Sequence, residues 1–295
     1  MTKECCGIIM AGGNGTRLSP LTISVNKHLL PVYDKPMIYY PLSTLMMSGI
    51  RDIAIITRKD DRAAYERLLG SGRQIGISLT YLEQEEPKGI PQAYQISSEF
   101  IGNRNVGLIL GDNIFLGQGM GNLLKKASQT LHAEIFAFPV KNPEDYGVVV
   151  LDEATNKIIK IVEKPKIRQS NLAIPGLYFT NSDVVNRSRN LKTSSRGEFE
   201  ITDVLNSYLS EDKLEIEIFR RGIGWMDAGS VESLYSAGEL IRVLQERQGL
   251  RFGSPEEIAW RNGWISSKEL LASTSKYGDT SYGVYLNSIL TDLRL

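Results

Sequence analysis

The sequence predicts an α/β protein built around a mainly parallel, doubly wound sheet. Short apolar runs alternate with stretches of helical apolar spacing between residues 7 and 110, which is the pattern of consecutive β-α-β units. Two of the apolar runs end in loops that contain glycine or aspartate, at Gly12 and at Asp112. With 295 residues and 42% hydrophobic side chains, the chain can also bury a sizeable core.

The first half of the chain supplies the parallel strands and the helices between them. Strands are predicted at 7–10, 50–57, 78–84 and 106–110, and helices at 37–48, 60–69 and 92–100. Gly49 and Gly70 directly follow the first two helices, where glycine is typical of a C-terminal cap. Because ligands bind beyond the carboxyl ends of strands in such sheets, we expect the glycine-rich loop and Asp112 to share one edge.

The second half of the chain is richer in strands. Short strands separated by turns are predicted at 133–140, 146–151, 158–163 and 173–179, followed by a strand at 214–220. Helices are predicted at 201–210, at 231–249 and from Ser254 onward, where Ser followed by Pro255 is a typical helix start. The run of strands and turns predicts an inserted region, not further β-α-β units.

Composition argues against several classes of function. The charges of the 34 basic and 34 acidic residues cancel. The chain therefore lacks the overall positive charge that would predict a nucleic-acid partner. The two cysteines, Cys5 and Cys6, are adjacent, which predicts small apolar residues of the first strand and not a disulfide or a zinc site. No apolar stretch is long enough for a membrane span and no secretory leader precedes the first strand, so we expect a cytoplasmic protein without a membrane partner.

The loop after the first strand is suited to binding an anion. Its sequence is Gly12-Gly13-Asn14-Gly15-Thr16-Arg17, and Lys27 follows further along. Glycines let backbone N–H groups approach an anion closely, and the two basic residues add fixed positive charge. The spacing matches neither the P-loop nor the dinucleotide fingerprint. The predicted ligand is therefore the polyphosphate of a nucleotide, with a purely structural turn as the alternative.

Ordered sequence blocks through almost the whole chain extend this interpretation. The blocks are Met10–Arg17, Lys27–Pro31, Tyr33–Leu42, Leu110–Asn113, Tyr146–Val149, Glu163–Pro165, Gly176–Phe179, Arg196–Asp203 and Trp225–Gly229. In these blocks the chain resembles the sugar nucleotidyltransferases, and most of all the glucose-1-phosphate thymidylyltransferases. The resemblance implies a Rossmann-like, doubly wound mixed sheet of the nucleotidyltransferase type, with an inserted sugar-binding region and a C-terminal helical part.

The same resemblance implies a division of the chain. Residues 1–230 would form the nucleotidyltransferase core, with a nucleotide-binding half at about 1–115 and a sugar-binding region at about 133–225. Residues 231–295 would serve assembly into a homotetramer and regulation. In the longer family members this region helps to form a second nucleotide site for feedback inhibition by dTDP-L-rhamnose, and Glu257, Ile258 and Arg261 are the candidates near it. An ordinary amphipathic helix that packs on a neighbour is the alternative.

The activity implied by the resemblance is transfer of a thymidylyl group from dTTP to α-D-glucose 1-phosphate, a first step towards dTDP-deoxysugars such as dTDP-L-rhamnose. Asp112 and Asp227 would hold Mg²⁺, which prefers carboxylate and phosphate oxygens. Arg17 would contact the α-phosphate and the leaving group, and Lys27 the pyrophosphate side. Two alternatives stay open: a uridylyltransferase for another hexose 1-phosphate, and a non-catalytic sensor of nucleotide sugars.

The second substrate has its own candidate residues by the same resemblance. Lys164 and Arg196 are expected to bind the sugar phosphate, and Glu163 the sugar hydroxyls. Gly147 and Gly176 would present backbone groups to the sugar with Tyr178 nearby, and Glu198 is a weaker candidate for this site.

Recognition of the base is assigned to the segment 84–93. Gln84 can pair with both a donor and an acceptor of a pyrimidine edge, and Gly89 would let the backbone approach the base. The chain departs from the usual family pattern here, with Glu85 in place of Pro, Lys88 in place of Asp or Gly, and Pro91 in place of Ala. Val162, which replaces the first Glu of the usual Glu-Glu-Lys-Pro, is expected to matter less. The base-loop departures leave selectivity between thymine and uracil open.

Overall fold

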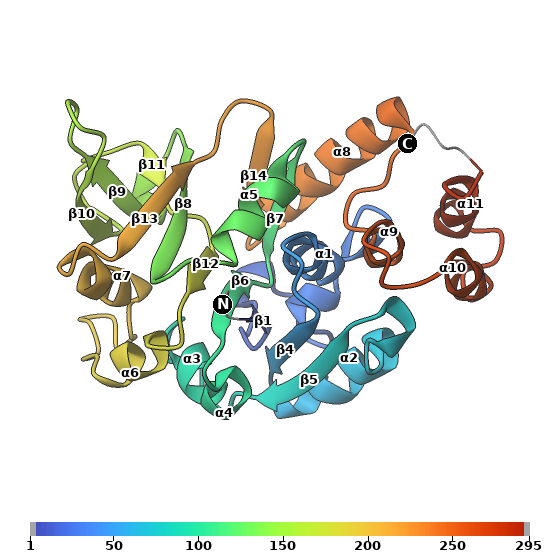
Figure 1. Cartoon of the computed structure of the whole chain (residues 1–295), viewed down its shortest axis with the longest axis horizontal. Helices are drawn as coiled ribbons and strands as arrows, with labels where there is room; N and C mark the ends of the chain where they lie inside the picture. Colours follow the sequence, from blue (N-terminus) through green and yellow to red (C-terminus); the bar gives the residue numbers. More distant parts are fainter. Residues whose placement is uncertain (1–3, 292–295) are drawn as a thin grey trace.

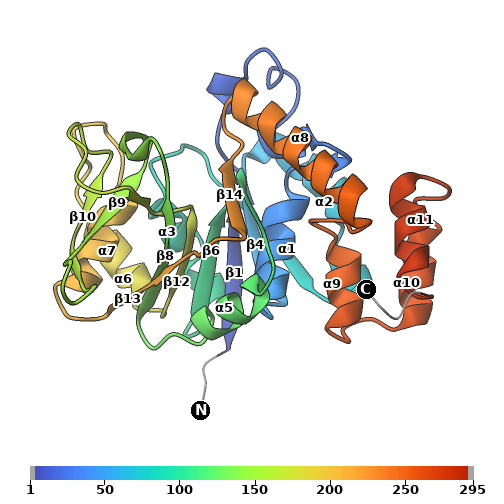
Figure 2. The same ribbon diagram turned by 90° about the horizontal axis from the view of Figure 1, so that it is seen from above.

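A large mixed sheet forms the centre of the computed structural model, which describes residues 4–291, and helices cover both of its faces (Figures 1 and 2). Within the described range this sheet has ten strands, in the order β10-β9-β11-β8-β12-β6-β1-β4-β5, with β13 paired to β8. The parallel part consists of β1 (Cys5–Met10), β4 (Asp52–Thr57), β5 (Ser78–Glu83) and β6 (Asn105–Leu110). The predicted α/β class with a mixed sheet is thus confirmed.

The second half of the chain adds strands that are mostly antiparallel. They are β8 (Ala133–Pro139), β9 (Gly147–Leu151), β10 (Ile158–Glu163), β11 (Leu172–Ala173), β12 (Leu177–Thr180) and β13 (Leu214–Ile218). The strand predicted at 173–179 is wrong in one respect, because β11 and β12 are separate strands. Pro175 lies between them and lacks the N–H that a continuous ladder would need.

The helices predicted in the first half are present with small changes. They are α1 (Tyr39–Met47) and α2 (Arg62–Leu69), with positive φ angles of 88° at Gly49 and 60° at Gly70. The helix predicted at 92–100 is interrupted at Ser97, so that α3 (Gln92–Ile96) and α4 (Ser98–Ile101) are two short helices. Ser97 departs from helical geometry with φ −92° and ψ 12°.

Several elements escaped sequence prediction. They are β2 (Pro31–Val32), β3 (Lys35–Pro36), β7 (Asn113–Gly117), α5 (Met120–Ala127), α6 (Val184–Arg189) and β14 (Ile223–Asp227). The pair β7 and β14 forms a separate antiparallel ribbon in which Asp227 lies opposite Asn113. This ribbon brings the end of the second half of the chain back to the carboxyl edge of the parallel strands.

The C-terminal helices lie together on one side of the sheet (Figures 1 and 2). They are α8 (Val231–Gln248), α9 (Pro255–Arg261), α10 (Ser267–Thr274) and α11 (Ser281–Ser288). α9 packs against α1, so the tail is joined to the core. The division at residue 230 stays a prediction, and residues 1–3 and 292–295 at the ends of the two predicted parts lie outside the described residues. Across residues 4–291 no helix combines the length and apolar character that crossing a membrane requires.

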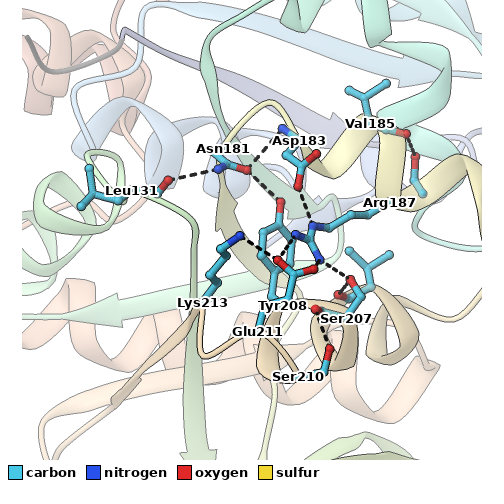
Figure 3. Close-up of polar contacts among 12 residues, drawn as sticks. Leu131, Asn181, Asp183, Val185, Arg187, Ser207, Tyr208, Ser210, Glu211 and Lys213 are labelled. Atoms are coloured by element: carbon cyan, nitrogen blue, oxygen red, sulfur yellow. Dashed lines mark hydrogen bonds and ion pairs between the residues drawn. The ribbon is translucent and has the colours of Figure 1, made fainter.

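A polar cluster fixes α7 (Ile201–Leu209) to α6 (Figure 3). The Arg187 guanidinium lies 4.0 Å from the centre of the Tyr208 ring and donates to both carboxylate oxygens of Glu211 at 2.9 Å. It also donates to Asp183 at 2.8 Å, while the Tyr208 hydroxyl donates to Asn181 at 2.9 Å. These contacts matter for the site because the N-terminal end of α7 borders the main polar cavity.

Candidate active site

The carboxyl edge of the parallel strands holds the glycine-rich loop and Asp112, as predicted. β1 and β6 are parallel neighbours in which Met10 pairs with Leu110. The loop leaves β1 directly after Met10, and Asp112 follows β6 by two positions. Both segments therefore emerge side by side from the same edge of the sheet.

The glycines of this loop are needed for close approach. A Cβ at Gly12 would lie 2.4 Å from the Gln84 Oε1 atom, and one at Gly15 would lie 3.1 Å from the Lys27 Cβ atom. Gly15 also has a φ of 61°, a conformation that glycine adopts without strain. Gly13 lies against the Lys27 side chain, with a Cβ position 3.6 Å from the Lys27 Cε atom. The loop is thus in contact with Gln84 and Lys27.

Four charged side chains converge where this loop meets β7 and β14. The Lys27 Nζ atom forms an ion pair with Asp112 Oδ2, and the Ala228 N–H donates to the Asp112 carbonyl at 2.9 Å. A Cβ on Gly229 would lie 2.7 Å from Asp227 Oδ1 and 2.8 Å from Arg17 Nη2, so both groups border this glycine. The structure therefore brings together Arg17, Lys27, Asp112 and Asp227. Thr16 is exposed and begins the short 3₁₀ turn Thr16–Leu18.

The two carboxylates differ in their electrostatic surroundings. Burial is the largest single effect on Asp112 and raises its pKa, but the opposing effects of Lys27, His28 and Asn113 together hold the pKa below its ordinary value. Burial and the negative charge of Asp112 raise the pKa of Asp227, against the opposing effect of Arg17. Asp227 Oδ1 is also buried without a hydrogen-bond partner. A buried, repelled and unpartnered carboxylate oxygen is what a bound cation would stabilise.

This pair of aspartates fits the oxygen chemistry of Mg²⁺. Within residues 4–291 no group of three or more His, Cys, Asp or Glu side chains is placed to hold a metal. Mg²⁺ in phosphate-transferring sites commonly takes one or two carboxylates and completes its octahedron with phosphate oxygens and waters. The donor set here is therefore sufficient for Mg²⁺ bound together with a nucleotide.

His28 and Asn26 hold the backbone on both sides of Lys27. The His28 N–H donates to Asn26 Oδ1 at 3.0 Å, and the Tyr65 hydroxyl donates to the same oxygen at 2.9 Å. The His28 Nδ1 atom lies 2.8 Å from it. Burial, with a smaller effect of Lys27, lowers the pKa of His28 to about 3. A neutral imidazole therefore supports Lys27 at ordinary pH.

A cavity of about 220 Å³ borders three of these charged residues, Arg17, Asp112 and Asp227. It is bordered by segments of both halves of the chain. Eleven of the predicted residues line it: Arg17, Gly89, Asp112, Gly147, Glu163, Lys164, Gly176, Tyr178, Arg196, Glu198 and Asp227. A larger cavity of about 380 Å³, between α2, α9 and α10, contains none of them. The sugar-phosphate candidates thus lie next to the nucleotide candidates.

Arg196 is surrounded by carboxylates within this cavity. Its Nη2 atom lies 2.6 Å from Glu200, 3.2 Å from Glu163 and 3.8 Å from Glu198. Burial and the charge of Glu200 raise the pKa of Glu163. Lys164 has a positive φ of 39°, an uncommon conformation for a residue with a side chain. Sequence reasoning missed Glu200, although it lies in the same block as Arg196.

Asn113 is a further site residue to which the sequence analysis gave no role. Its side-chain oxygen accepts from the Gly176 N–H at 2.9 Å and from Trp225 Nε1 at 2.6 Å. Its amide nitrogen donates to Asp112 Oδ1 at 3.1 Å. Trp225 in turn meets the Tyr146 ring edge-on, with 4.9 Å between ring centres. The position directly after Asp112 was the one available signal.

The base segment is ordered around a second glutamine. Gln92 Oε1 accepts from Gln84 Nε2 at 2.7 Å and from the Lys88 N–H at 2.9 Å. One N–H of the Gln84 amide is thus bonded to Gln92, and the Gln84 oxygen lies beside Gly12. The departures are benign in geometry: Glu85 and Lys88 are exposed, and Pro91 sits at the start of α3, where an N–H needs no helical partner.

The predicted regulatory residues lie away from this site. Glu257, Ile258 and Arg261 line a separate cavity of about 180 Å³, between α9, α1 and β7. The Arg261 Nε atom donates to Glu257 at 2.8 Å, and the Tyr285 hydroxyl donates to the other oxygen of that carboxylate at 2.7 Å. Ser43 Oγ also borders this cavity and is buried without a hydrogen-bond partner. The structure therefore places these residues at a second cavity, separate from the first.

Comparison with known proteins supports the geometry. The profile of the nucleotidyl transferase family matches residues 6–242. A glucose-1-phosphate thymidylyltransferase of Mycolicibacterium smegmatis is 49% identical over 284 residues, which is 96% of this chain and 98% of that protein. One of Neisseria gonorrhoeae is 50% identical over 95% of this chain and 97% of its own length.

A solved structure agrees with these matches. The crystal structure of a UDP-glucose pyrophosphorylase complexed with UDP-glucose has a TM-score of 0.70 and 28% identity, and covers 83% of this chain and 100% of its own. The family profile and the near full-length relatives agree with a fold that holds basic and acidic residues at the edge of its parallel strands. The chain belongs to the nucleotidyl transferase family and, within it, to the glucose-1-phosphate thymidylyltransferases.

Proposed function

We propose that the chain transfers a thymidylyl group from dTTP to α-D-glucose 1-phosphate and releases pyrophosphate. An oxygen of the sugar phosphate attacks the α-phosphorus of dTTP, and the bond from that phosphorus to the bridging oxygen of pyrophosphate breaks in line. No bond to the protein forms in this scheme. The protein contributes by aligning two anions and by neutralising the charge that develops between them.

One observation carries the proposal: Arg17, Lys27, Asp112 and Asp227 converge between the glycine-rich loop and the 220 Å³ cavity. The loop and Gln84 would hold the nucleotide, and the cavity would hold the sugar phosphate against Lys164 and Arg196. The attacking oxygen would then approach the α-phosphate beside Arg17. A sensor that only binds nucleotide sugars would not need these basic and acidic side chains placed together between two substrate sites.

The two aspartates would hold Mg²⁺ together with the nucleotide. A bound Mg²⁺ would supply Lewis-acid stabilisation to the phosphate oxygens. Lys27 keeps Asp112 ionised by direct pairing, and Asn113 orients the same carboxylate through Oδ1. Arg17, with its planar fork of donors, would stabilise charge on the α-phosphate and the departing oxygen.

Uridylyl transfer is the alternative reaction. The similarity to thymidylyltransferases at 49–50% identity, against 28% for the UDP-glucose pyrophosphorylase, supports thymidylyl transfer. A place early in dTDP-deoxysugar synthesis, such as that of dTDP-L-rhamnose, would follow from the product.

Assembly and regulation are part of the proposal. α8 carries four exposed apolar residues, Val231, Tyr235, Leu240 and Val243, which supports burial of this helix against other copies in a homotetramer. The cavity at Glu257, Ile258 and Arg261, with the unpartnered Ser43 hydroxyl, supports a regulatory nucleotide site.

Pyrophosphate release over a panel of nucleoside triphosphates and sugar 1-phosphates, with and without Mg²⁺, tests the reaction. We expect turnover with dTTP and glucose 1-phosphate that requires Mg²⁺, and no turnover with that pair would refute the assignment. Asp112→Asn and Asp227→Asn should each lower kcat by about 100-fold or more while dTTP still binds. Asp60→Asn, at an exposed position, is the control, and unchanged turnover in both site variants would remove the metal role.

A further inference from the structure

Two loops from different halves of the chain meet above the cavity. The base loop, residues 84–92, follows β5, and the phosphate loop, residues 194–200, precedes α7. The Phe199 N–H donates to the Lys88 carbonyl at 2.9 Å. This is a backbone contact between the loop assigned to the nucleotide base and the loop that carries Arg196.

The close contact between the two loops depends on the absence of a side chain at Gly89. Its φ is 103°, and a Cβ at this position would lie 2.1 Å from the Phe199 carbonyl oxygen and 3.0 Å from the Phe199 nitrogen. Both atoms belong to the backbone, so they cannot move aside as a flexible side chain would. The two loops touch at Gly89 with no room for a side chain.

The base loop is rigidly connected to the nucleotide side. Gln92 Oε1 receives the Lys88 N–H at 2.9 Å and the Gln84 amide at 2.7 Å. Gln84 in turn borders Gly12 of the glycine-rich loop. A nucleotide that fixes Gln84 therefore also fixes Lys88 and Gly89.

Two backbone hydrogen bonds close the phosphate loop on itself. The Ser194 N–H donates to the Glu198 carbonyl at 2.8 Å, and the Gly197 N–H donates to the Ser194 carbonyl at 2.9 Å. Arg196, on this turn, is paired with Glu200 at 2.6 Å. The position of Phe199 thus sets the position of the Arg196 guanidinium in the cavity.

We propose that the contact of Gly89 with Phe199 couples the two substrate sites. A nucleotide seated on the base loop holds the phosphate loop, and with it Arg196, in place for the sugar phosphate. By linkage, a bound sugar phosphate raises the affinity for the nucleotide by the same factor. Phe199 and Gly89 act here as positioning residues, and the inference rests on the proposed substrates.

Gly89→Ala is the test variant, and Gly197→Ala is its matched control. Gly197 has a similar positive φ of 77° but no atom within 4 Å of its Cβ position. Both variants carry a backbone cost, and Gly89→Ala in addition separates the loops. The measurement is the Kd of glucose 1-phosphate, by calorimetry, with and without saturating α,β-methylene-dTTP, which cannot be cleaved at the α-phosphorus.

In the unmodified chain we expect the analogue to lower this Kd about fivefold or more. The ratio should fall to near one in Gly89→Ala and stay at the original value in Gly197→Ala. A ratio of one in the unmodified chain, or an unchanged ratio in Gly89→Ala, would overturn the coupling. A wrong substrate assignment would show separately, in the pyrophosphate-release panel.

Hydrogen exchange on the unmodified chain tests the same idea without a variant. The analogue alone should slow exchange in a peptide covering residues 194–200, and leave β13 unaffected. No slowing in the phosphate loop would contradict the proposal even if Gly89→Ala failed to fold.

Discussion

Replacing Lys27 with methionine should destabilise the fold as well as slow turnover, because Lys27 neutralises a buried carboxylate. Its side chain is 13% exposed and that of Asp112 is 11% exposed, so solvent screens the pair weakly. Asp227 lies close enough to Asp112 that the negative charge of Asp112 raises the pKa of Asp227. Lys27→Met would leave two buried carboxylates facing each other with Arg17 as the main neighbouring cation.

The magnitude follows from the burial of the pair. Unit charges about 4 Å apart interact by about 4 kcal/mol at an effective dielectric constant near 20, and removing one partner of a buried pair costs about 3–5 kcal/mol. We expect Lys27→Met to lower the free energy of unfolding by about 3 kcal/mol. Asp112→Asn should cost only about 1 kcal/mol, because the charge of Lys27 still acts on Asp227 through space and the carboxylate repulsion disappears.

A double-mutant cycle separates this role from catalysis. The double variant Lys27→Met with Asp112→Asn should lose about 2 kcal/mol rather than the sum of about 4 kcal/mol, a coupling of about 2 kcal/mol. Urea unfolding at pH 7.5 measures the three values, and pyrophosphate release should be low in all three variants. Adding Asp112→Asn to Lys27→Met would then restore part of the free energy of unfolding without restoring turnover, which separates the effect on stability from the effect on activity.

The exposed pair Arg242 and Glu246 on α8 provides the control cycle. Their side chains are 39% and 54% exposed, so their coupling should stay below about 0.5 kcal/mol. Additive effects at Lys27 and Asp112, within the same 0.5 kcal/mol, would refute the claim that Lys27 neutralises Asp112. Normal kinetics in Lys27→Met would clear Lys27 of contact with the triphosphate.

Two further predictions concern stability. The pKa of His28 is about 3 in the folded chain against an ordinary 6.5, so the unfolded chain takes up the proton first and the free energy of unfolding falls as pH drops below 6.5. His28→Asn should remove about 2 kcal/mol of this loss by pH 5. The same pH dependence in the variant and the unmodified chain between pH 6.5 and 4 would contradict this. Arg187→Lys should lower the free energy of unfolding by about 1–2 kcal/mol, since it loses the bidentate pairing with Glu211 and the stacking on Tyr208; an unchanged urea midpoint would speak against it.

The parallel half of the fold was predictable because its strands are buried on both faces. Ile8 and Ile9 of β1 and Ile55 and Ile56 of β4 are all fully buried, which produces continuous apolar runs in the sequence. The ribbon of β7 and β14 carries a weaker signal, because its buried apolar run is limited to Ile114, Phe115 and Leu116 on β7. Its strands are short and pair across more than 100 positions, as the bond from Trp225 to Asn113 shows with a separation of 112 residues. The local pattern of apolar residues cannot predict a pairing between strands so far apart in the sequence.

The residues of the candidate site also differ in how far the sequence predicts them. Arg17, Lys27 and Asp112 are foreseeable, since each follows a strand of the parallel sheet at its carboxyl end. Asn113 and Glu200 are not, because their importance lies in contacts with distant segments. Pro91, one of the departures in the base segment, takes the N-cap position of α3, which needs no N–H of its own.

The environment of Arg196 changes what the sequence suggests about binding of the sugar phosphate. Three carboxylates already share this guanidinium, at 2.6, 3.2 and 3.8 Å, so a phosphate must take the place of at least one of them. Lys164 has no ion pair within 4.0 Å among the described residues, and its charge acts on Glu163 and Glu200 only at longer range. On the proposed function, Lys164 therefore supplies most of the attraction for the phosphate, and Arg196 contributes mainly by orientation. The carboxylate that a phosphate displaces from Arg196 is then free to accept from sugar hydroxyls, so one exchange of partners would seat both ends of glucose 1-phosphate.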